Sequence, residues 1–229
     1  MRGEPCILVG LDLVSLCPFH VAPLVWEARP GEWTLTVCVK ATFMLENGTE
    51  SIVAETQRPL DDDRFFSDTA LSSLRSPGDF APFKPKADIL LVGHAYAPSG
   101  VPADSVTATL KVGEWSKSVR VTGDRALVEG PGGFAPGPAV PFTHVPLRYE
   151  RAAIDVNNPV GIDVHRTTGG AVLVPNLEAV ERGHMPGFGP ISPEWRARRA
   201  TLRDEALFWA HGVGARGRVS TGPAPHDLD

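Results

Sequence analysis

The chain has 229 residues and a formal net charge of -5, with 42% hydrophobic and 21% charged residues, a balance typical of a globular protein. The acidic balance argues against binding of nucleic acid through a basic surface, and no apolar stretch is long enough to cross a bilayer. Glycine and proline, at 23 and 22 residues, are well above average. Together they predict many turns and short elements.

The N-terminal region contains two apolar runs, residues 7–16 and 21–26, which we expect to form strands or an edge segment. Apolar and polar residues then alternate over residues 33–45, the period that turns one face of a strand toward a core. Asn47-Gly48 follows, a strong signal for a hairpin turn. We expect residues 51–55 to return antiparallel as the second strand of that hairpin.

An acidic segment and a short helix are expected next. Three adjacent carboxylates, Asp61, Asp62 and Asp63, could recruit a divalent cation, although consecutive acids on a loop are more often solvated. Residues 67–75 are expected to form a short helix that begins at Ser67 or Asp68.

Residues 84–100, KPKADILLVGHAYAPSG, contain the run that we interpret as the central strand of the fold. Residues 89–92 are all apolar, as in a strand that is buried on both faces. Gly93 has backbone freedom that other residues lack, and His94 and Tyr96 follow it. We therefore expect a buried strand that delivers both side chains to one rim, where they either form a site or simply end the strand.

Alternation returns over residues 106–112 and 115–122, and with residues 126–129 it predicts an antiparallel meander. Residues 130–140 are almost all Gly, Pro and Ala and predict a long loop. The fold class is therefore mainly β, an antiparallel β-sandwich-like domain with a loop-rich C-terminal half and short helices. The domain is expected to span residues 1–211, with pieces of helix from Pro193 to His211, and residues 212–229 form a Gly/Pro-rich tail.

No catalytic motif is complete in this sequence. The patterns G-x-S-x-G, H-E-x-x-H and the phosphate loop are absent, and the three cysteines lack the spacing of a zinc site. The sequence leaves open whether His94, His144 and His165 converge on a metal or proton-transfer site. We expect no metal, no cofactor and, since no signal peptide is evident, a cytoplasmic protein.

Short motifs follow one another along most of the chain. In order they are VKATF at 39–43, KPKAD at 84–88, GHAYAP at 93–98, GDR at 123–125, PLRYERA at 146–152, NPVG at 158–161, PNLE at 175–178, GFGP at 187–190 and WRAR at 195–198. This series resembles the domain-of-unknown-function family 2169. The resemblance implies a non-catalytic adaptor or chaperone of bacterial type VI secretion that binds an effector protein and helps to load it onto the VgrG/PAAR spike.

The expected binding surface is a rim where the end of the central strand meets several loops. Its predicted partner-binding residues are His94, Tyr96, Pro98, Tyr149, Glu150, Arg151, Asn158, Asn176, Glu178 and Phe188. Residues expected to hold turns are Gly93, Gly123, Asp124, Arg125, Pro159 and Gly161. Aromatic and Arg side chains suit such a surface because they bury much area with few rotatable bonds.

Two alternatives remain open from the residues. One is a hydrolase-like enzyme in which His94 works with Asp88, Asp124 or Glu150 as its orienting carboxylate. The other is a β-type ligand-binding module, which would present exposed and coplanar rings of Trp26, Trp33 or Trp115.

Overall fold

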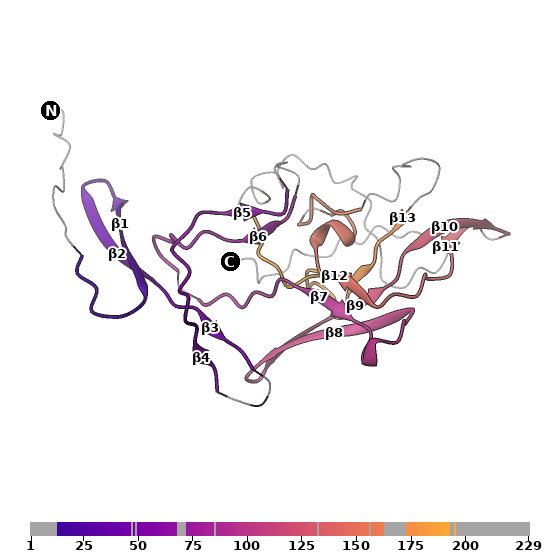
Figure 1. Cartoon of the computed structure of the whole chain (residues 1–229). Helices are drawn as coiled ribbons and strands as arrows, with labels where there is room; N and C mark the ends of the chain where they lie inside the picture. The colour runs from indigo at the N-terminus through magenta and orange to yellow at the C-terminus, as the bar shows by residue number, and fades with distance from the viewer. Residues whose placement is uncertain are drawn as a thin grey trace. The chain divides into compact units, whose positions relative to one another are not determined.

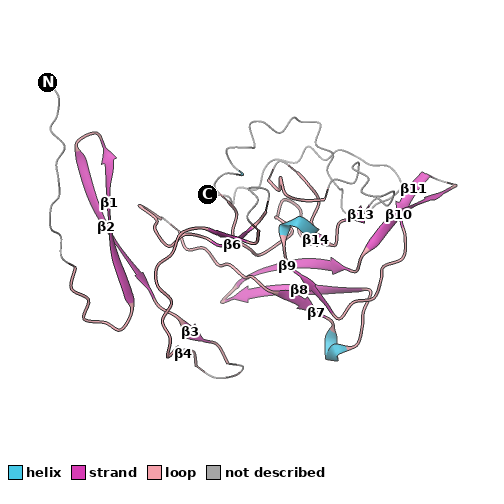
Figure 2. Cartoon of the chain, turned by 45° about the horizontal axis from the view of Figure 1, so that its top comes forward, coloured by secondary structure: helices cyan, strands magenta, loops and turns pink. Residues whose placement is uncertain are grey.

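The computed structural model describes residues 13–46, 48, 50–67, 72–84, 86–131, 133–155, 157–162, 173–192 and 195. Its strands pair antiparallel in small sheets of two or three strands (Figure 1). Two short 3-10 helices, η1 (Pro98–Gly100) and η2 (Tyr149–Arg151), accompany them (Figure 2). The expected mainly β, antiparallel fold is confirmed. In the described part of the chain, no helix has the length and hydropathy to span a membrane.

The chain divides into two compact units. The first comprises residues 1–63 and 78–87, and the second comprises residues 64–77 and 88–229. The strands of the first unit are β1 (His20–Arg29), β2 (Glu32–Lys40), β3 (Phe43–Met44) and β4 (Ile52–Val53). They form two hairpins, β1 with β2 and β3 with β4.

The β1–β2 hairpin is the longest paired element of the first unit (Figure 1). Gly31 lies in its turn with a φ of 82°, a conformation that favours glycine, and its N–H donates to Glu27 Oε1 at 2.6 Å. The strand expected over residues 33–45 is interrupted after Lys40, and β3 begins a new pairing with β4. Of the predicted hairpin, only Phe43–Met44 pair with the expected return strand, at Ile52–Val53, whereas Glu32–Lys40 pair with His20–Arg29.

The second unit contains ten strands among its described residues. They are β5 (Arg64–Phe65), β6 (Leu74–Ser76), β7 (His94–Tyr96), β8 (Ser105–Val112), β9 (Trp115–Thr122), β10 (Arg125–Gly130), β11 (Gly133–Pro136), β12 (His144–Pro146), β13 (Leu173–Val174) and β14 (Leu177–Ala179). The predicted meander is confirmed for β8 and β9, which pair antiparallel (Figure 2). It does not continue to β10, because β10 pairs with β11 and β13 and not with β9. The sheet orders are β14-β9-β8, β11-β10-β13, β12-β7 and β5-β6.

The core lies in the second unit. Val119 and Val121, two residues apart on β9, are fully buried with Leu177 of β14. A second cluster joins Tyr149, Met185 and Trp195, with partly buried Val160 and Ile191 against it. The ring of Trp195 lies edge-on to that of Tyr149, with 5.4 Å between the ring centroids. Both clusters include residues of the loop-rich C-terminal half, which is thereby fixed to the strands.

The central strand was predicted wrongly. Residues 89–92 are not in a strand, and their side chains are each 38–44% exposed. The backbone N–H of Leu91 bonds to the carbonyl of Phe188 at 2.8 Å, but this stretch joins no strand ladder in the described part of the chain. The strand begins two residues later, at His94, and pairs with β12.

Two further predictions of local structure were wrong. The last two residues of the expected helix over residues 67–75 belong instead to β6, Leu74–Ser76, which pairs with β5; residues 68–71 lie outside the described part. Within the expected loop over residues 130–140, Gly133–Pro136 form β11, which pairs with β10 through the backbone. The expected helix from Pro193 to His211 and the tail after it lie outside the described residues, apart from Trp195.

Candidate functional site

One face of the β1–β2 hairpin is mostly apolar and mostly exposed; Glu27, opposite Trp33, is the charged residue at one end of it. Val25 stands opposite Leu35, Pro23 opposite Val37 and Val21 opposite Val39, so these side chains share a face of the ribbon. On β2 this face continues through Trp33, and the exposed fractions are 49% for Trp33, 43% for Leu35, 46% for Val37 and 58% for Val39. We call this set, Val21, Pro23, Val25, Trp33, Leu35, Val37 and Val39, the hairpin face.

The opposite, more polar face of the ribbon is the one that contacts the rest of the first unit. Trp26 Nε1 donates to Thr36 Oγ1 at 3.0 Å, and Thr36 Oγ1 donates to the carbonyl of Pro82 at 2.6 Å. Lys40 forms a 2.6 Å ion pair with Asp79. The alternation over residues 33–45 therefore has the period that was expected, but its apolar side is the exposed one.

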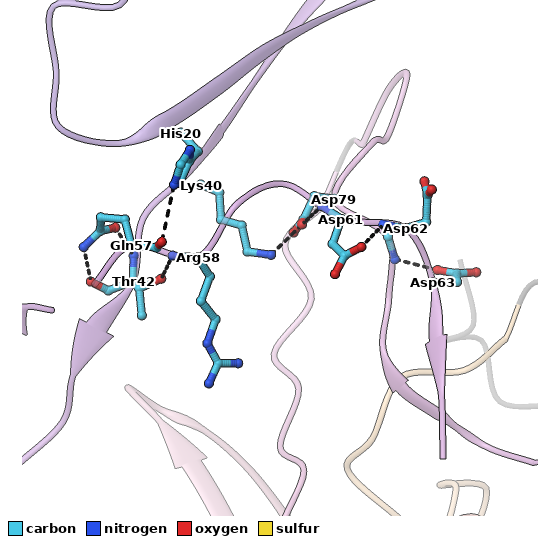
Figure 3. Close-up of polar contacts among 10 residues, drawn as sticks. His20, Lys40, Thr42, Gln57, Arg58, Asp61, Asp62, Asp63 and Asp79 are labelled. Carbon is cyan, nitrogen blue, oxygen red and sulfur yellow. Dashed lines mark hydrogen bonds and ion pairs between the residues drawn. The ribbon is translucent and has the colours of Figure 1, made fainter. Parts of the chain in front are cut away.

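Polar side chains bonded to backbone hold the first unit together (Figure 3). The Gln57 side chain bonds to both backbone groups of Thr42, which lies between β2 and β3. Its Oε1 accepts from Thr42 N at 2.8 Å, and its Nε2 donates to Thr42 O at 3.1 Å. Asp79 accepts from the backbone N–H of Asp61 at 2.8 Å through the same oxygen that meets Lys40. A side-chain amide thus takes the place of a strand partner at the break.

Two of the three consecutive acids predicted as a possible cation site, Asp61 and Asp63, are turned toward backbone groups (Figure 3). Asp61 Oδ1 accepts from Asp62 N at 3.0 Å, and Asp63 Oδ1 accepts from Gly78 N at 2.5 Å. Across the described residues, no group of three or more His, Cys, Asp or Glu side chains is arranged to hold a metal ion.

The first unit has no buried residue among those that the structure describes. Its apolar side chains on β3 and β4, Phe43, Met44, Ile52 and Val53, are about half exposed as well. A two-stranded hairpin is at best marginally stable in water unless its apolar face is packed, and contiguous exposed apolar surface of this kind marks sites of protein association. This arrangement therefore suits binding of another protein surface.

The predicted partner-binding residues fall into three groups: exposed, buried and charged. His94, Tyr96 and Pro98 are exposed, and Tyr96 is 68% accessible. His144 of β12 joins them, because its ring lies 5.5 Å from that of His94 and 6.1 Å from that of Tyr96. Two of the three histidines whose convergence was left open therefore meet, and His165 lies outside the described residues.

Other predicted residues are buried. Tyr149, Asn158, Asn176 and Phe188 are each no more than 4% exposed. Asn158 Nδ2 donates to the carbonyls of Tyr149 and Ala153, both at 2.9 Å, and Tyr149 Oη donates to Gly189 O at 3.1 Å. Burial also raises the pKa of the Tyr149 phenol above its ordinary value. In this structure these side chains support the loops from inside.

Two charged residues among those predicted to bind the partner, Arg151 and Glu178, form a network with the predicted turn residues Asp124 and Arg125. Arg151 Nη1 donates to Asp124 Oδ1 and to Asn176 Oδ1, both at 3.0 Å, and Asn176 Nδ2 donates to Asp124 Oδ1 at 2.9 Å. Arg125 pairs with Glu178 at 3.2 Å, and its guanidinium also donates to the carbonyl of Pro175. The network joins the turn after β9 to η2 and to the segment between β13 and β14.

A pocket of about 530 Å³ lies beside this network, with walls that carry both signs of charge. It is lined by Asp104, Ser105, Arg120, Thr122, Arg125, Ala135, Pro136 and Glu178. His94 is not in its lining. Of the carboxylates considered for an enzyme, Asp124 bonds to Arg151 and Asn176, and both oxygens of Glu150 accept from Ser73 at 2.6 Å.

Two of the three predicted turn glycines have steric reasons to be glycine, whereas a Cβ at Gly93 would meet no atom within 4 Å. A Cβ at Gly123 would collide with the carbonyl of Val140, and one at Gly161 would lie 2.5 Å from the backbone of Ala153. Of the tryptophans considered for ligand binding, Trp33 and Trp115 are about half exposed, whereas Trp26 is half-buried and bonded to Thr36.

The residues of the hairpin face were not among the predicted site residues. Their alternation was visible in the sequence, but it was interpreted as packing on a core. No pattern in the sequence separates an exposed apolar face from one that packs on a core. In the structure, the segment that meets the other face of the ribbon contributes Asp79 and the carbonyl of Pro82.

A family model described as "Uncharacterized protein conserved in bacteria (DUF2169)" matches residues 30–211. No curated protein and no solved structure matches the chain.

Proposed function

This chain belongs to the DUF2169 family of uncharacterised bacterial proteins, and from that premise we propose that it is a non-catalytic adaptor that binds a second protein through the hairpin face. The observation that carries the proposal is a unit rich in apolar side chains in which no described residue is buried. An adaptor needs such a surface, because apolar area removed from water is the main favourable term in protein association.

The free energy that would be gained by covering the hairpin face supports the adaptor role. Complete burial of a Val or Leu side chain contributes about 1.5–3 kcal/mol relative to full exposure. Trp33, Leu35, Val37 and Val39 each retain about half of their exposure. Covering all four would therefore contribute several kcal/mol, which is enough to offset a substantial part of the entropic cost of association.

The finer proposal names the partner class. The partner is an effector of bacterial type VI secretion, and the adaptor acts in the cytoplasm, where it helps to load the effector onto the VgrG/PAAR spike. The motif series along residues 39–198 supports this assignment through the family resemblance described above. Chaperoned loading also suits a surface that is apolar in the free adaptor, because the surface is covered once the effector is bound.

The experiment compares affinity capture by three forms of the tagged full chain from lysates of the bacterium that encodes it. They are the wild type, the double variant Leu35→Asp plus Val37→Asp, and the control Val101→Asp. Val101 is 64% exposed in the second unit, so the control introduces the same charge on an apolar position away from the hairpin face. Circular dichroism checks that all three are folded.

An effector or a spike protein that is recovered in stoichiometric amount by the wild type and by Val101→Asp, and lost by the double variant, supports both levels of the proposal. A recovered partner unrelated to secretion would overturn the assignment to type VI secretion while leaving the adaptor role. Equal recovery by all three forms would remove the hairpin face as the binding surface.

A further inference from the structure

Three rings gather on the outer face of the two-stranded β7–β12 sheet. His94 and Tyr96 are two residues apart on β7, and His144 of β12 stands directly opposite Tyr96. The ring centroids of His94 and His144 are 5.5 Å apart, and the ring of Tyr96 stacks on His144 at 6.1 Å with an interplanar angle of 30°. All three side chains are exposed.

The backbone beneath these rings is firmly placed. Ala95 and Val145, which alternate with them along the two strands, are 5% and 4% exposed and belong to the main core cluster. Backbone bonds continue the ladder at both ends, from Ala97 N to Thr143 O at 2.8 Å and from Leu147 N to Gly93 O at 2.9 Å. The separation of the two backbone positions that carry the imidazoles is therefore set by a packed sheet, and a preorganised ligand pair needs such a rigid base.

The spacing of the two histidines suits a shared metal ion. An imidazole nitrogen binds zinc at about 2.0–2.1 Å, and with roughly 1 Å from each nitrogen to its ring centre, two rings around one tetrahedral ion have centroids about 5–6 Å apart. The observed 5.5 Å lies within that interval.

The contact between His144 and Thr143 accommodates the tautomer that a metal needs. Its Nδ1 lies 3.2 Å from Thr143 Oγ1. A metal-bound histidine commonly donates its other ring N–H to a neighbouring oxygen, which fixes the tautomer and the ring orientation. With the proton on Nδ1, Thr143 accepts it and the lone pair of Nε2 is left for the ion.

We propose that His94 and His144 form a two-histidine site for a divalent transition-metal ion that prefers imidazole ligands, such as Cu²⁺, Ni²⁺ or Zn²⁺. The site does not depend on the proposed adaptor function. No third His, Cys, Asp or Glu of the described residues completes it, so the remaining coordination positions are open to solvent or to a side chain of a bound molecule. Affinity for the three ions is expected to follow their intrinsic order for nitrogen ligands, with Cu²⁺ the tightest.

The test titrates the tag-free full chain with Cu²⁺, Ni²⁺ and Zn²⁺ by isothermal calorimetry. The variants are His94→Asn, His144→Asn and both together, and the matched control is His20→Asn, another exposed histidine on a strand of the first unit. Electron paramagnetic resonance of the Cu²⁺ complex reports the number of nitrogen ligands independently of affinity.

We expect one ion per chain, tightest for Cu²⁺, with two imidazole nitrogens in the spectrum. Each single variant should weaken binding roughly tenfold or more, because the chelate is lost. The control His20→Asn should bind the metal ions as the wild type does. All the histidine variants should keep the wild-type melting temperature, because the replaced side chains are exposed. Unchanged binding by the double variant, or no saturable binding by the wild type at millimolar free metal, overturns the proposal.

Discussion

Gly187 lies directly against the phenol ring of Tyr149: a Cβ at position 187 would come within 2.6 Å of Tyr149 Cε1 and 3.0 Å of Cζ. The ring has little freedom to move aside, because Tyr149 is buried and Trp195 packs edge-on against it. We therefore expect Gly187→Ala to lower the free energy of unfolding by about 1–3 kcal/mol, as overpacking of a core does. Urea denaturation measures this change.

The neighbouring Gly189 provides the matched control. A Cβ there would lie 3.7 Å from Tyr149 Cε2, an ordinary van der Waals distance. Gly189→Ala should therefore cost much less than Gly187→Ala. Equal losses at the two positions would show that the contact with the ring is not what requires glycine at 187.

Tyr149 also predicts a loss of stability in alkali. Burial raises the pKa of its phenol in the folded protein, so the folded state keeps the proton at a pH where the unfolded chain releases it. The stabilising contribution is complete below the unfolded pKa of about 10 and is lost as pH rises above it, by about 1.4 kcal/mol per pH unit for one proton.

The measurement is urea denaturation at a series of pH values from neutral to strongly alkaline, for the wild type and for Tyr149→Phe. The variant loses the bond to Gly189 O and is expected to be about 1 kcal/mol less stable at neutral pH. Its stability should fall less steeply above pH 10. Parallel curves for the two proteins would contradict the assignment of the slope to Tyr149.

The ion pair between Arg125 and Glu178 is expected to matter because it is largely buried, with side chains 15% and 13% exposed. Arg125→Ala would leave the Glu178 carboxylate without its partner, and removal of one member of such a pair costs about 3–5 kcal/mol. Thermal denaturation measures the loss. The surface pair of Arg29 and Glu32, at 3.8 Å, is the control, and Arg29→Ala should change stability by no more than about 0.5 kcal/mol.

A double replacement distinguishes the contribution of the ion pair to stability from the contribution of the packing around it. Arg125→Leu together with Glu178→Leu removes both charges, so it should cost less than Arg125→Ala alone. If the double variant were the less stable of the two, the loss would come from packing and from the bond to Pro175 O, not from an uncompensated charge.

Where the sequence predicted structure well, the determinants are local. Strands β8 and β9 each alternate, and Gly113 between them has a φ of 60° that suits the tight turn. Where it failed, the determinants come from other parts of the chain. The apolar run over residues 89–92 has the composition of a buried strand but finds no ladder partner, whereas β11 has a composition typical of a loop and pairs through its backbone with β10.

The candidate site shows the same division. Residue type and motif position identified Tyr149, Asn158 and Asn176 as important, but whether a side chain points inward or outward depends on tertiary packing that no local pattern encodes. The period of the hairpin face was predictable and its exposure was not. A period of two says only that the two faces differ, and which face is covered depends on the segment that comes to lie against the ribbon.

The exposure of the hairpin face leads to a direct comparison between two valines on strands. Val37 of β2 is 46% exposed, and Val119 of β9 is fully buried. Threonine has nearly the shape of valine but carries a hydroxyl, which costs about 1–3 kcal/mol where it is buried without a partner and little where water can reach it. We expect Val119→Thr to lose stability in that range and Val37→Thr to stay within about 0.5 kcal/mol of the wild type.

Urea denaturation of the two variants measures both changes, and binding of a fluorescent apolar dye should fall only for Val37→Thr. A loss at Val37 as large as the loss at Val119 would mean that the hairpin face is already covered in the isolated protein, and the adaptor proposal would then lose the surface on which it rests.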